Sequence, residues 1–250
     1  MCLITFSWLQ HPDYKLILVA NRDEYFQRPT QSLHQWENGI YAGKDLKEGG
    51  TWLGFHPKGR FAALTNFRDM SRERPRERSR GELVSGFLDG KLSPLSYLKQ
   101  VEKARENYNG FNLLLGEGDA LYVYSNYGGG IQRIAPGVHA ISNAFLDTPW
   151  PKVIRAKEQL KTMLDHKKPG LDSLLDLLQS KMPASEKDLP ETGLSKELEK
   201  AVSAQFIRVD DYYGTVNTTA VLWHQDGTAE IKEIRTVPQR EINEFAIQVK

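Results

Sequence analysis

The stretch CLITFSWLQHPDYKLILVANRDE, residues 2–24, contains two short runs of branched and aromatic residues, at 2–9 and 16–20. Runs of this length and composition are typical of β-strands. The residues between them, His11-Pro12-Asp13-Tyr14, favour a turn. The stretch therefore predicts a β-hairpin at the start of the chain. Its second strand would carry four polar residues, 21–24, back toward the chain's first residues.

The rest of the chain alternates between groups of strands and groups of helices. The sequence predicts a second hairpin from 51–55 and 61–66, and two short helices between about 70 and 106. It then predicts a strand meander (111–115, 121–124, 131–134, 138–142), helical segments (151–178, 194–204) and closing strands (215–223, 229–237, 245–249). Because strands do not alternate strictly with helices, we expect an α+β protein with antiparallel sheets, in a single domain spanning 1–250.

Composition and charge narrow the class of protein. The chain is 40% hydrophobic and 26% charged, which is ordinary for a folded domain. Its 33 basic and 32 acidic residues give no general attraction to nucleic acid or to anionic membranes. No apolar run approaches the length of a membrane span, and no signal peptide is recognisable, so we expect no stable membrane insertion. The lone cysteine excludes an internal disulfide and predicts a cytoplasmic location.

Cys2 is the first candidate for chemistry. Removal of Met1 would leave a chain that begins with a thiol beside its own α-amino group. That amine has an ordinary pKa of about 7.7–8.0 and can accept the thiol proton, so one residue supplies both nucleophile and base. The alternative is that Cys2 merely starts a buried strand next to Leu3 and Ile4.

The hairpin decides which residues share a face with Cys2. A two-residue turn at Pro12-Asp13 would set Cys2 opposite Asp23 and Ile4 opposite Asn21. Asn21 and Asp23 would then lie on the same side as the thiol, Asp23 to orient the ammonium group and Asn21 to donate to a substrate oxygen. A shift of one residue would bring Arg22 to that face instead.

The sequence shows no metal site. Its six histidines lack the spacing of metal ligands, so we expect no metal and no required cofactor. Haem as a bound ligand stays open, because a single axial ligand, one histidine or Cys2, is sufficient to hold it.

Several motifs together resemble the NRDE family, which includes the transport-and-Golgi-organisation protein 2 group. They are Met1-Cys2, Asn21-Arg22-Asp23-Glu24, Gly50-Thr51-Trp52-Leu53-Gly54, Thr65-Asn66-Phe67-Arg68, Ser142-Asn143 and Tyr213-Gly214-Thr215. The resemblance covers nearly the whole chain. Family members usually carry arginine after Tyr-Gly-Thr, whereas this chain has Val216 and Asn217.

The same motifs are more distantly similar to cysteine N-terminal-nucleophile hydrolases of the choloylglycine hydrolase and penicillin V acylase type. That resemblance implies a four-layer αββα sandwich. It implies that Cys2 is the nucleophile, that Asp23 orients its amine, and that Asn66 and Asn143 hold the oxyanion or the substrate. We expect substrate-binding roles for five further residues: Asn21, Arg22, Glu24, Trp52 and Arg68.

An arginine-rich segment, residues 68–80, directly follows Asn66. Such a segment is usually a solvated loop, because its acidic residues cancel much of its charge. Placed near Cys2, it would instead bind a carboxylate, propionate or phosphate.

Two function hypotheses follow, with a third ranked lowest. The first is hydrolysis of a C–N amide bond through a Cys2 acyl-enzyme. The second, implied by the family resemblance, is non-catalytic haem binding and trafficking, or the handling of acyl-CoA or lipids. The third is a degenerate scaffold without a small-molecule role. The first two predict a small-molecule ligand, anionic and amphipathic, and no nucleic-acid partner.

Overall fold

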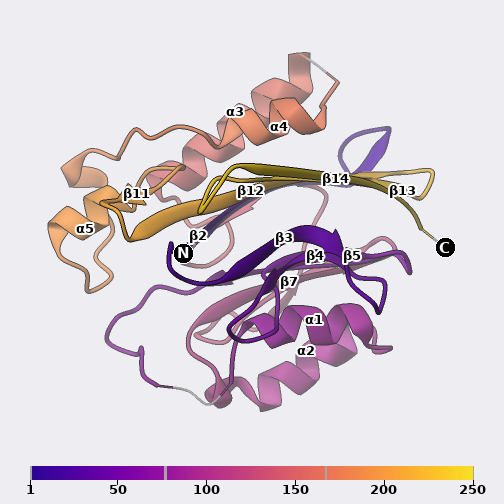
Figure 1. The fold of residues 1–250 in the computed structure, drawn as a ribbon, viewed down its shortest axis with the longest axis horizontal. Helices are drawn as coiled ribbons and strands as arrows, with labels where there is room; N and C mark the ends of the chain where they lie inside the picture. Colours follow the sequence, from indigo (N-terminus) through magenta and orange to yellow (C-terminus); the bar gives the residue numbers. More distant parts are fainter. Residues whose placement is uncertain (1, 76–77, 167, 250) are drawn as a thin grey trace.

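A computed structural model describes residues 2–75, 78–166 and 168–249, and over these residues the chain forms two antiparallel sheets of seven strands each. The sheets face each other, and helices cover both outer faces (Figure 1). The predicted α+β, four-layer αββα architecture is confirmed.

The first sheet has the strand order β10-β1-β2-β12-β13-β14, with β11 paired to β12. Its strands are β1 (Cys2–Trp8), β2 (Tyr14–Tyr25), β10 (Gly137–Ile141), β11 (Arg208–Val209), β12 (Tyr213–His224), β13 (Thr228–Arg235) and β14 (Glu241–Gln248). Helices α3 (Pro151–His166) and α4 (Leu171–Leu177) pack on its outer face. Two shorter helices, η2 (Glu186–Asp188) and α5 (Lys196–Ala201), precede β11.

The second sheet follows the chain in simple order, β3-β4-β5-β6-β7-β8-β9. Its strands are β3 (Thr30–Gln35), β4 (Tyr41–Asp45), β5 (Leu53–His56), β6 (Arg60–Asn66), β7 (Phe111–Glu117), β8 (Ala120–Ser125) and β9 (Ile131–Arg133). Helices α1 (Gly81–Asp89) and α2 (Pro94–Lys103) cover its outer face, and a single turn, η1 (Arg105–Asn107), follows them. No helix in the described part of the chain is both long and apolar enough to cross a membrane.

Alternation along the strands produces three separate apolar layers. On β1, Phe6 and Trp8 point between the sheets, where they join a cluster that includes Phe61 from the second sheet. Leu3, on the opposite face of β1, packs with Val153 of α3. A third cluster joins the second sheet to α1 and α2. A strand that buries both faces needs apolar residues at successive positions, which explains the continuous apolar runs of β1 and β2.

Two features of the fold differ from the prediction. β3 and β4 were not predicted, because TQSLHQ and YAGKD contain no apolar run. The predicted meander of four strands is wrong at its last member. β7, β8 and β9 stay in the second sheet, but β10 crosses to the first sheet and pairs with β1, with Ile141 opposite Ile4. This crossing places Ser142 and Asn143 beside the start of the chain.

Candidate active site

The β1–β2 hairpin positions Cys2, but in a register that differs from the predicted one. Cys2 lies opposite Arg22, and Leu3 lies opposite Asn21. The turn is longer than two residues: Leu9, in the left-handed region with φ of 46°, donates its N–H to the carbonyl of Lys15. The prediction that Cys2 faces Asp23 was therefore wrong by one residue, and the alternative that brings Arg22 to the thiol face is correct.

This register gives Asn21 a structural position. Its side chain points toward the helices that cover the first sheet and is 1% exposed. The amide donates to the carbonyls of Leu178 and Gln205 at 3.0 and 2.9 Å and accepts from the Thr218 hydroxyl at 2.7 Å. The expectation that Asn21 and Asp23 share the thiol face was wrong, because both alternate with Arg22 along β2. The amide N–H groups of Asn21 are already used within the fold.

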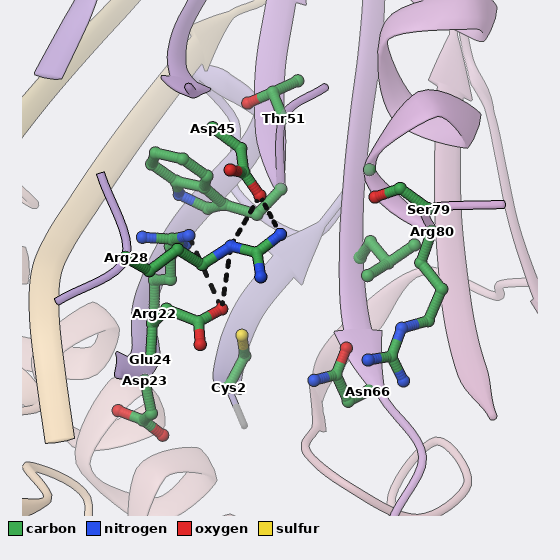
Figure 2. Close-up of a pocket in the computed structure, with 13 residues that line it drawn as sticks. Cys2, Arg22, Asp23, Glu24, Arg28, Asp45, Thr51, Asn66, Ser79 and Arg80 are labelled. Atoms are coloured by element: carbon green, nitrogen blue, oxygen red, sulfur yellow. Dashed lines mark hydrogen bonds and ion pairs between the residues drawn. The ribbon is translucent and has the colours of Figure 1, made fainter. Parts of the chain in front are cut away.

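Cys2 lines a cavity of about 110 Å³ between the two sheets (Figure 2). The other lining residues are Arg22, Asp23, Glu24, Arg28, Asp45, Thr51, Trp52, Leu64, Asn66, Ser79, Arg80 and Gly81. They come from both sheets and from the segment before α1, so the cavity forms only when the two layers meet. Of the nine predicted site residues, six lie in this lining, whereas Asn21, Arg68 and Asn143 do not.

The Cys2 thiol is buried, and its surroundings shift its pKa in both directions. Burial and the charge of Asp23 raise the pKa of Cys2, while the charge of the chain's amino terminus, a backbone hydrogen bond from Asp23 and the charge of Arg22 act in the opposite direction. A thiol with a raised pKa stays protonated at neutral pH. It therefore needs a base close by before it can act as a nucleophile.

Asp23 lies just beyond the end of β1, because β2 continues past the Cys2–Arg22 pair. Its carboxylate accepts a hydrogen bond from the Thr215 hydroxyl at 2.7 Å, and its backbone carbonyl accepts one from the Tyr213 hydroxyl at 3.3 Å. Burial raises the pKa of Asp23, opposed by the amino terminus, Lys152 and Thr215. Two members of the Tyr-Gly-Thr motif thus hold Asp23 in place.

Gly214, the middle residue of that motif, permits a close crossing of two backbones. A Cβ at this position would lie 2.4 Å from the carbonyl oxygen of Ile207. Val216 and Asn217, where family members usually carry arginine, line a different cavity with Arg235. The Asn217 amide donates to Glu233 at 2.8 Å.

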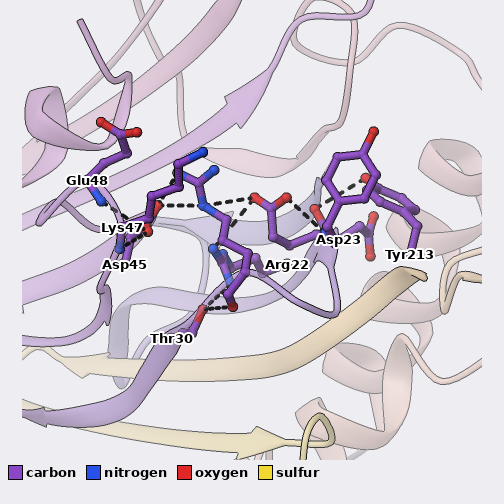
Figure 3. Close-up of polar contacts among 10 residues, drawn as sticks. Arg22, Asp23, Thr30, Asp45, Lys47, Glu48 and Tyr213 are labelled. Atoms are coloured by element: carbon purple, nitrogen blue, oxygen red, sulfur yellow. Dashed lines mark hydrogen bonds and ion pairs between the residues drawn. The ribbon is translucent and has the colours of Figure 1, made fainter. Parts of the chain in front are cut away.

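A chain of charged contacts forms one wall of the cavity, as Figures 2 and 3 show. Arg22 lies over the Trp52 ring at 4.1 Å and 3.6 Å from Glu24. Arg28 lies 3.7 Å from Glu24 and donates to Asp45 at 2.8 and 2.6 Å. These contacts orient the three predicted residues Arg22, Glu24 and Trp52 around the cavity.

Two glycines allow this wall to close. A Cβ on Gly43 would lie 2.4 Å from the Trp52 ring, so only glycine leaves room for the indole. A Cβ on Gly50 would lie 2.5 Å from the backbone of Gly81, where the N–H of Thr51 donates to the Gly81 carbonyl. This close approach brings Arg80, the neighbour of Gly81, into the cavity.

Asn66 and Asn143 occupy different positions. Asn66 ends β6 and lines the cavity opposite Cys2 (Figure 2). Asn143 is completely buried behind it and donates to the Asn66 carbonyl at 2.9 Å. Ser142 donates to the Cys2 carbonyl at 2.7 Å and to the Asn143 amide oxygen at 3.1 Å. The Ser142-Asn143 motif therefore ties the start of β1 to the end of β6.

The arginine-rich segment divides between two places. Arg68 is buried, lies over the Trp150 ring and pairs with Glu199 at 2.9 Å, away from the cavity. Arg80 reaches into the Cys2 cavity, and burial lowers its pKa. An adjoining cavity of about 220 Å³ is lined by Arg28, Glu48, Arg74, Pro75, Arg78, Ser79, Arg80 and Asn109. Arg76 lies outside the described residues.

Lys152 was missed by sequence reasoning. It is the second residue of α3 and is 3% exposed, and its ammonium group lies behind Asn143. A lysine in the first turn of a helix is disfavoured by the helix dipole, which is a weak signal that sequence alone offers. Among the residues described, no group of three or more histidine, cysteine, aspartate and glutamate side chains could hold a metal ion.

Solved structures with a similar arrangement define the class of the fold. The C2A mutant of conjugated bile acid hydrolase from Clostridium perfringens superposes with a TM-score of 0.55 at 12% identity, over 97% of this chain and 92% of that one. A Caenorhabditis elegans N-acylethanolamine-hydrolyzing acid amidase ortholog gives 0.50 at 9% identity, over 88% and 92%. The fold is that of the N-terminal-nucleophile hydrolases.

Sequence comparison identifies the family. The family described as Transport and Golgi organisation 2 matches residues 1–238. Transport and Golgi organization protein 2 homologs from Bos taurus and Homo sapiens are both 35% identical, each over 93% of this chain and 92% of the relative. The Drosophila melanogaster protein is 28% identical over 89% and 87%. The chain belongs to the Transport and Golgi organisation 2 family, and the predicted resemblance is confirmed.

Proposed function

We propose that this protein hydrolyses a C–N amide bond of a small acylated substrate through a thioester on Cys2. The observation that carries the proposal is the cavity in which Cys2, Asp23 and Asn66 meet. The bile acid hydrolase with the same fold was solved as a C2A mutant, so it too has a cysteine at its second position. Both of these structurally similar proteins are named for hydrolysis, one of conjugated bile acids and the other of N-acylethanolamines.

The reaction uses the α-amino group that Cys2 gains when Met1 is removed. The neutral amine takes the thiol proton, and the thiolate attacks the amide carbon while the carbonyl electrons move to oxygen. Collapse of this intermediate breaks the C–N bond, and the α-ammonium group protonates the leaving amine. Water, deprotonated by the same amine, then cleaves the thioester and releases a carboxylic acid and the free thiol.

Each neighbouring residue has a role in this scheme. Asp23, fixed by Thr215, orients the α-ammonium group. The Asn66 amide faces the cavity and donates to the developing oxyanion. Asn143 acts through Asn66, whose backbone carbonyl it binds at 2.9 Å. Because the burial that raises the pKa of Cys2 keeps the thiol protonated, the nearby amine is required.

The substrate class we propose is an acyl amide that carries an anionic group. Within the Cys2 cavity, the charges of Arg22, Arg28 and Arg80 are opposed by three carboxylates. The adjoining cavity has four arginines and one glutamate among its lining residues. A carboxylate or phosphate would therefore bind in the adjoining cavity while the acyl carbon lies at Cys2. A reducing compartment, the cytoplasm, would keep the thiol free.

Turnover of anionic acyl amides by Met1-free protein tests the proposal, and intact mass establishes whether Met1 is gone. We expect Cys2→Ala and Cys2→Ser to lower turnover by at least about 10³-fold, because the nucleophile is removed. Unchanged turnover in both variants would contradict the proposal. So would turnover by protein that retains Met1, since its Cys2 has no free amine.

The substrate class has its own test. Arg80→Met should raise KM for anionic acyl amides about tenfold and leave neutral analogues unaffected, since a charge-assisted contact is lost. Arg133→Met, at an exposed position that ends β9, is the matched control and should change neither. An equal loss for neutral and anionic substrates would show that Arg80 supports the fold and does not recognise charge.

A second candidate function is non-catalytic binding of an anionic amphipathic ligand, acyl-CoA or haem. The arginine-lined cavity beside Cys2 favours it, because phosphate or propionate groups would pair there. The cavity at Cys2, about 110 Å³, is too small for a porphyrin, so haem does not fit beside the thiol as the cavity stands. An acyl chain fits better. Two titrations separate these ligands: haem binding is followed by the Soret band, and acyl-CoA binding by calorimetry. Ligand binding that survives Cys2→Ala, in a protein without amide turnover, supports this second function.

A further inference from the structure

Lys152 occupies a position that is unfavourable for a cation. Its side chain is buried, and its ammonium group donates to the Asn143 amide oxygen at 3.4 Å and the Val202 carbonyl at 3.2 Å, both neutral. It also lies in the first turn of α3, where the helix dipole disfavours positive charge. Burying an ammonium group costs free energy unless nearby charges compensate. The neighbouring charges must therefore explain why a lysine is present.

Four charged or titratable groups face Lys152 from different elements. Asp23 comes from β2 and Cys2 from β1, Arg68 from the segment after β6, and Glu199 from α5. Glu199 already forms a buried ion pair with Arg68 at 2.9 Å. Because Arg68 offsets Glu199, Asp23 and an ionised Cys2 are the negative groups that Lys152 can stabilise. Burial and the charge of Arg68 lower the pKa of Lys152 to about 8, against the influence of Asp23, Cys2 and Glu199.

We propose that Lys152 is a positioning residue whose positive charge keeps Asp23 ionised and favours the thiolate of Cys2. The inference rests on the proposed function, since it concerns the same nucleophile. Lys152 acts from behind the site, through its charge and through Asn143, and does not line the cavity. The positive charge of Lys152 lowers the pKa of Asp23. An ionised Cys2 raises the pKa of Lys152, which means that Lys152 and the Cys2 thiolate attract each other.

Coupling between two titrating groups gives a recognisable signature. As the pH rises, Lys152 loses its proton, and the Cys2 thiolate then loses part of its stabilisation. The thiol should therefore titrate over a broader pH range than a single group. Lys152→Arg fixes the positive charge and should give a single, steeper titration. Lys152→Met removes the charge and should shift the titration to higher pH.

The rate at which iodoacetamide alkylates Met1-free protein measures this titration without any substrate. Cys2 is the only cysteine in the sequence, so mass spectrometry reports one site. Near neutral pH we expect Lys152→Met to slow alkylation by about threefold to tenfold, as loss of a neighbouring charge would. Lys152→Arg should react at least as fast as the wild type. Lys157→Met, which removes a more exposed lysine from the same helix, is the control and should leave the rate unchanged.

Identical pH–rate curves for the wild type and Lys152→Met would overturn the inference. If Lys152→Met does not fold, Lys152→Arg decides, because its curve must be steeper than that of the wild type. In an Asp23→Asn background Lys152→Met should slow alkylation at least as much as in the wild type, because the charge of Lys152 acts on the thiolate directly and the opposing charge of Asp23 is gone. If Lys152→Met slows alkylation as expected but the wild type hydrolyses no amide, only the proposed function is contradicted. If the wild type hydrolyses amides but its pH–rate curve for alkylation is the same as that of Lys152→Met, only the role of Lys152 is contradicted.

Discussion

The layer between the two sheets has two ends of opposite character, although β1 and β2 run through both. At one end Phe6 and Trp8 are 0% and 1% exposed and pack with Phe61 in a continuous apolar cluster. At the other end the same face of β1 ends at Cys2, beside Arg22 and the charged cavity. The apolar end supplies burial free energy, and the charged end contributes little of it. Mutations should therefore affect stability at one end and chemistry at the other.

The largest effect on stability should come from the apolar end. Phe6→Ala removes a completely buried ring, and we expect the free energy of unfolding to fall by about 3–5 kcal/mol because a cavity is left. Cys2→Ser, four residues earlier on the same face of β1, should change it by less than about 1 kcal/mol. Urea denaturation measures both values. Equal losses would remove the distinction between the two ends.

A second prediction concerns Glu233, which joins the sheets near the charged end. Its carboxylate accepts hydrogen bonds from the Leu33 N–H of the second sheet and from Asn217 and Thr219 of the first. Burial raises the pKa of Glu233 from its ordinary value of 4.5 to about 7. A carboxyl group whose pKa is raised by folding stabilises the folded state in its protonated form. That contribution is complete below about pH 4.5 and is lost as the pH rises through about 7.

From this we expect the free energy of unfolding to fall by about 1–3 kcal/mol between pH 4.5 and pH 8 because of Glu233 alone. Glu233→Gln should remove that part of the pH dependence. The measurement is urea denaturation of both proteins at several pH values. Parallel stability curves for the two proteins would show that folding does not raise the pKa of Glu233.

A third, smaller effect should come from the charged wall. Arg28→Met removes both hydrogen bonds to Asp45, whose carboxylate still accepts from the Lys47 N–H at 3.0 Å. The pair is partly exposed, so we expect a loss of about 1 kcal/mol that becomes smaller at high salt. Denaturation at low and high salt measures it. A loss as large as that of Phe6→Ala would mean that the charged wall also holds the sheets together.

The smallest effect should come from a surface ion pair at the apolar end. Lys15 and Asp119 join the two sheets at 2.8 Å, but the Asp119 side chain is 70% exposed. Lys15→Met should therefore change the free energy of unfolding by less than about 0.5 kcal/mol. A double-mutant cycle with Asp119→Asn measures the coupling directly. A coupling above about 1 kcal/mol would contradict the expectation that this exposed ion pair contributes little.

The sequence predicted the layers of this fold better than its local register. Apolar runs at β1 and β2 predicted a hairpin, which the structure confirms, and the layered sandwich was implied by the resemblance to N-terminal-nucleophile hydrolases. The register depended on the loop around Pro12, and turn composition does not fix loop length. β10 looked like the next strand of a meander, but only the tertiary partner, β1, decides which sheet it joins.

Sequence motifs predicted most of the candidate site. The two features that they did not predict, the Asn143–Asn66 contact and Lys152, depend on packing between distant parts of the chain. Residue type and the predicted hairpin indicated Cys2 and Asp23, and the resemblance implied Asn66. The structure brings all three to one cavity. Asn143 was named too, but no local pattern shows that its amide is used to hold Asn66. Lys152 carried no motif, because its importance arises only when α3 packs behind the start of β1.

The overhang of β2 beyond β1 has a practical consequence for anyone who fuses this protein to another. Asp23 and Tyr25 extend past the Cys2–Arg22 pair, so residues added before Cys2 would run alongside this part of β2. A leader or affinity tag there would occupy the space in which the α-amine must meet Asp23. Figure 1 shows the other end of the chain on the far side of the sandwich, after β14. Tags placed at that end leave the cavity untouched.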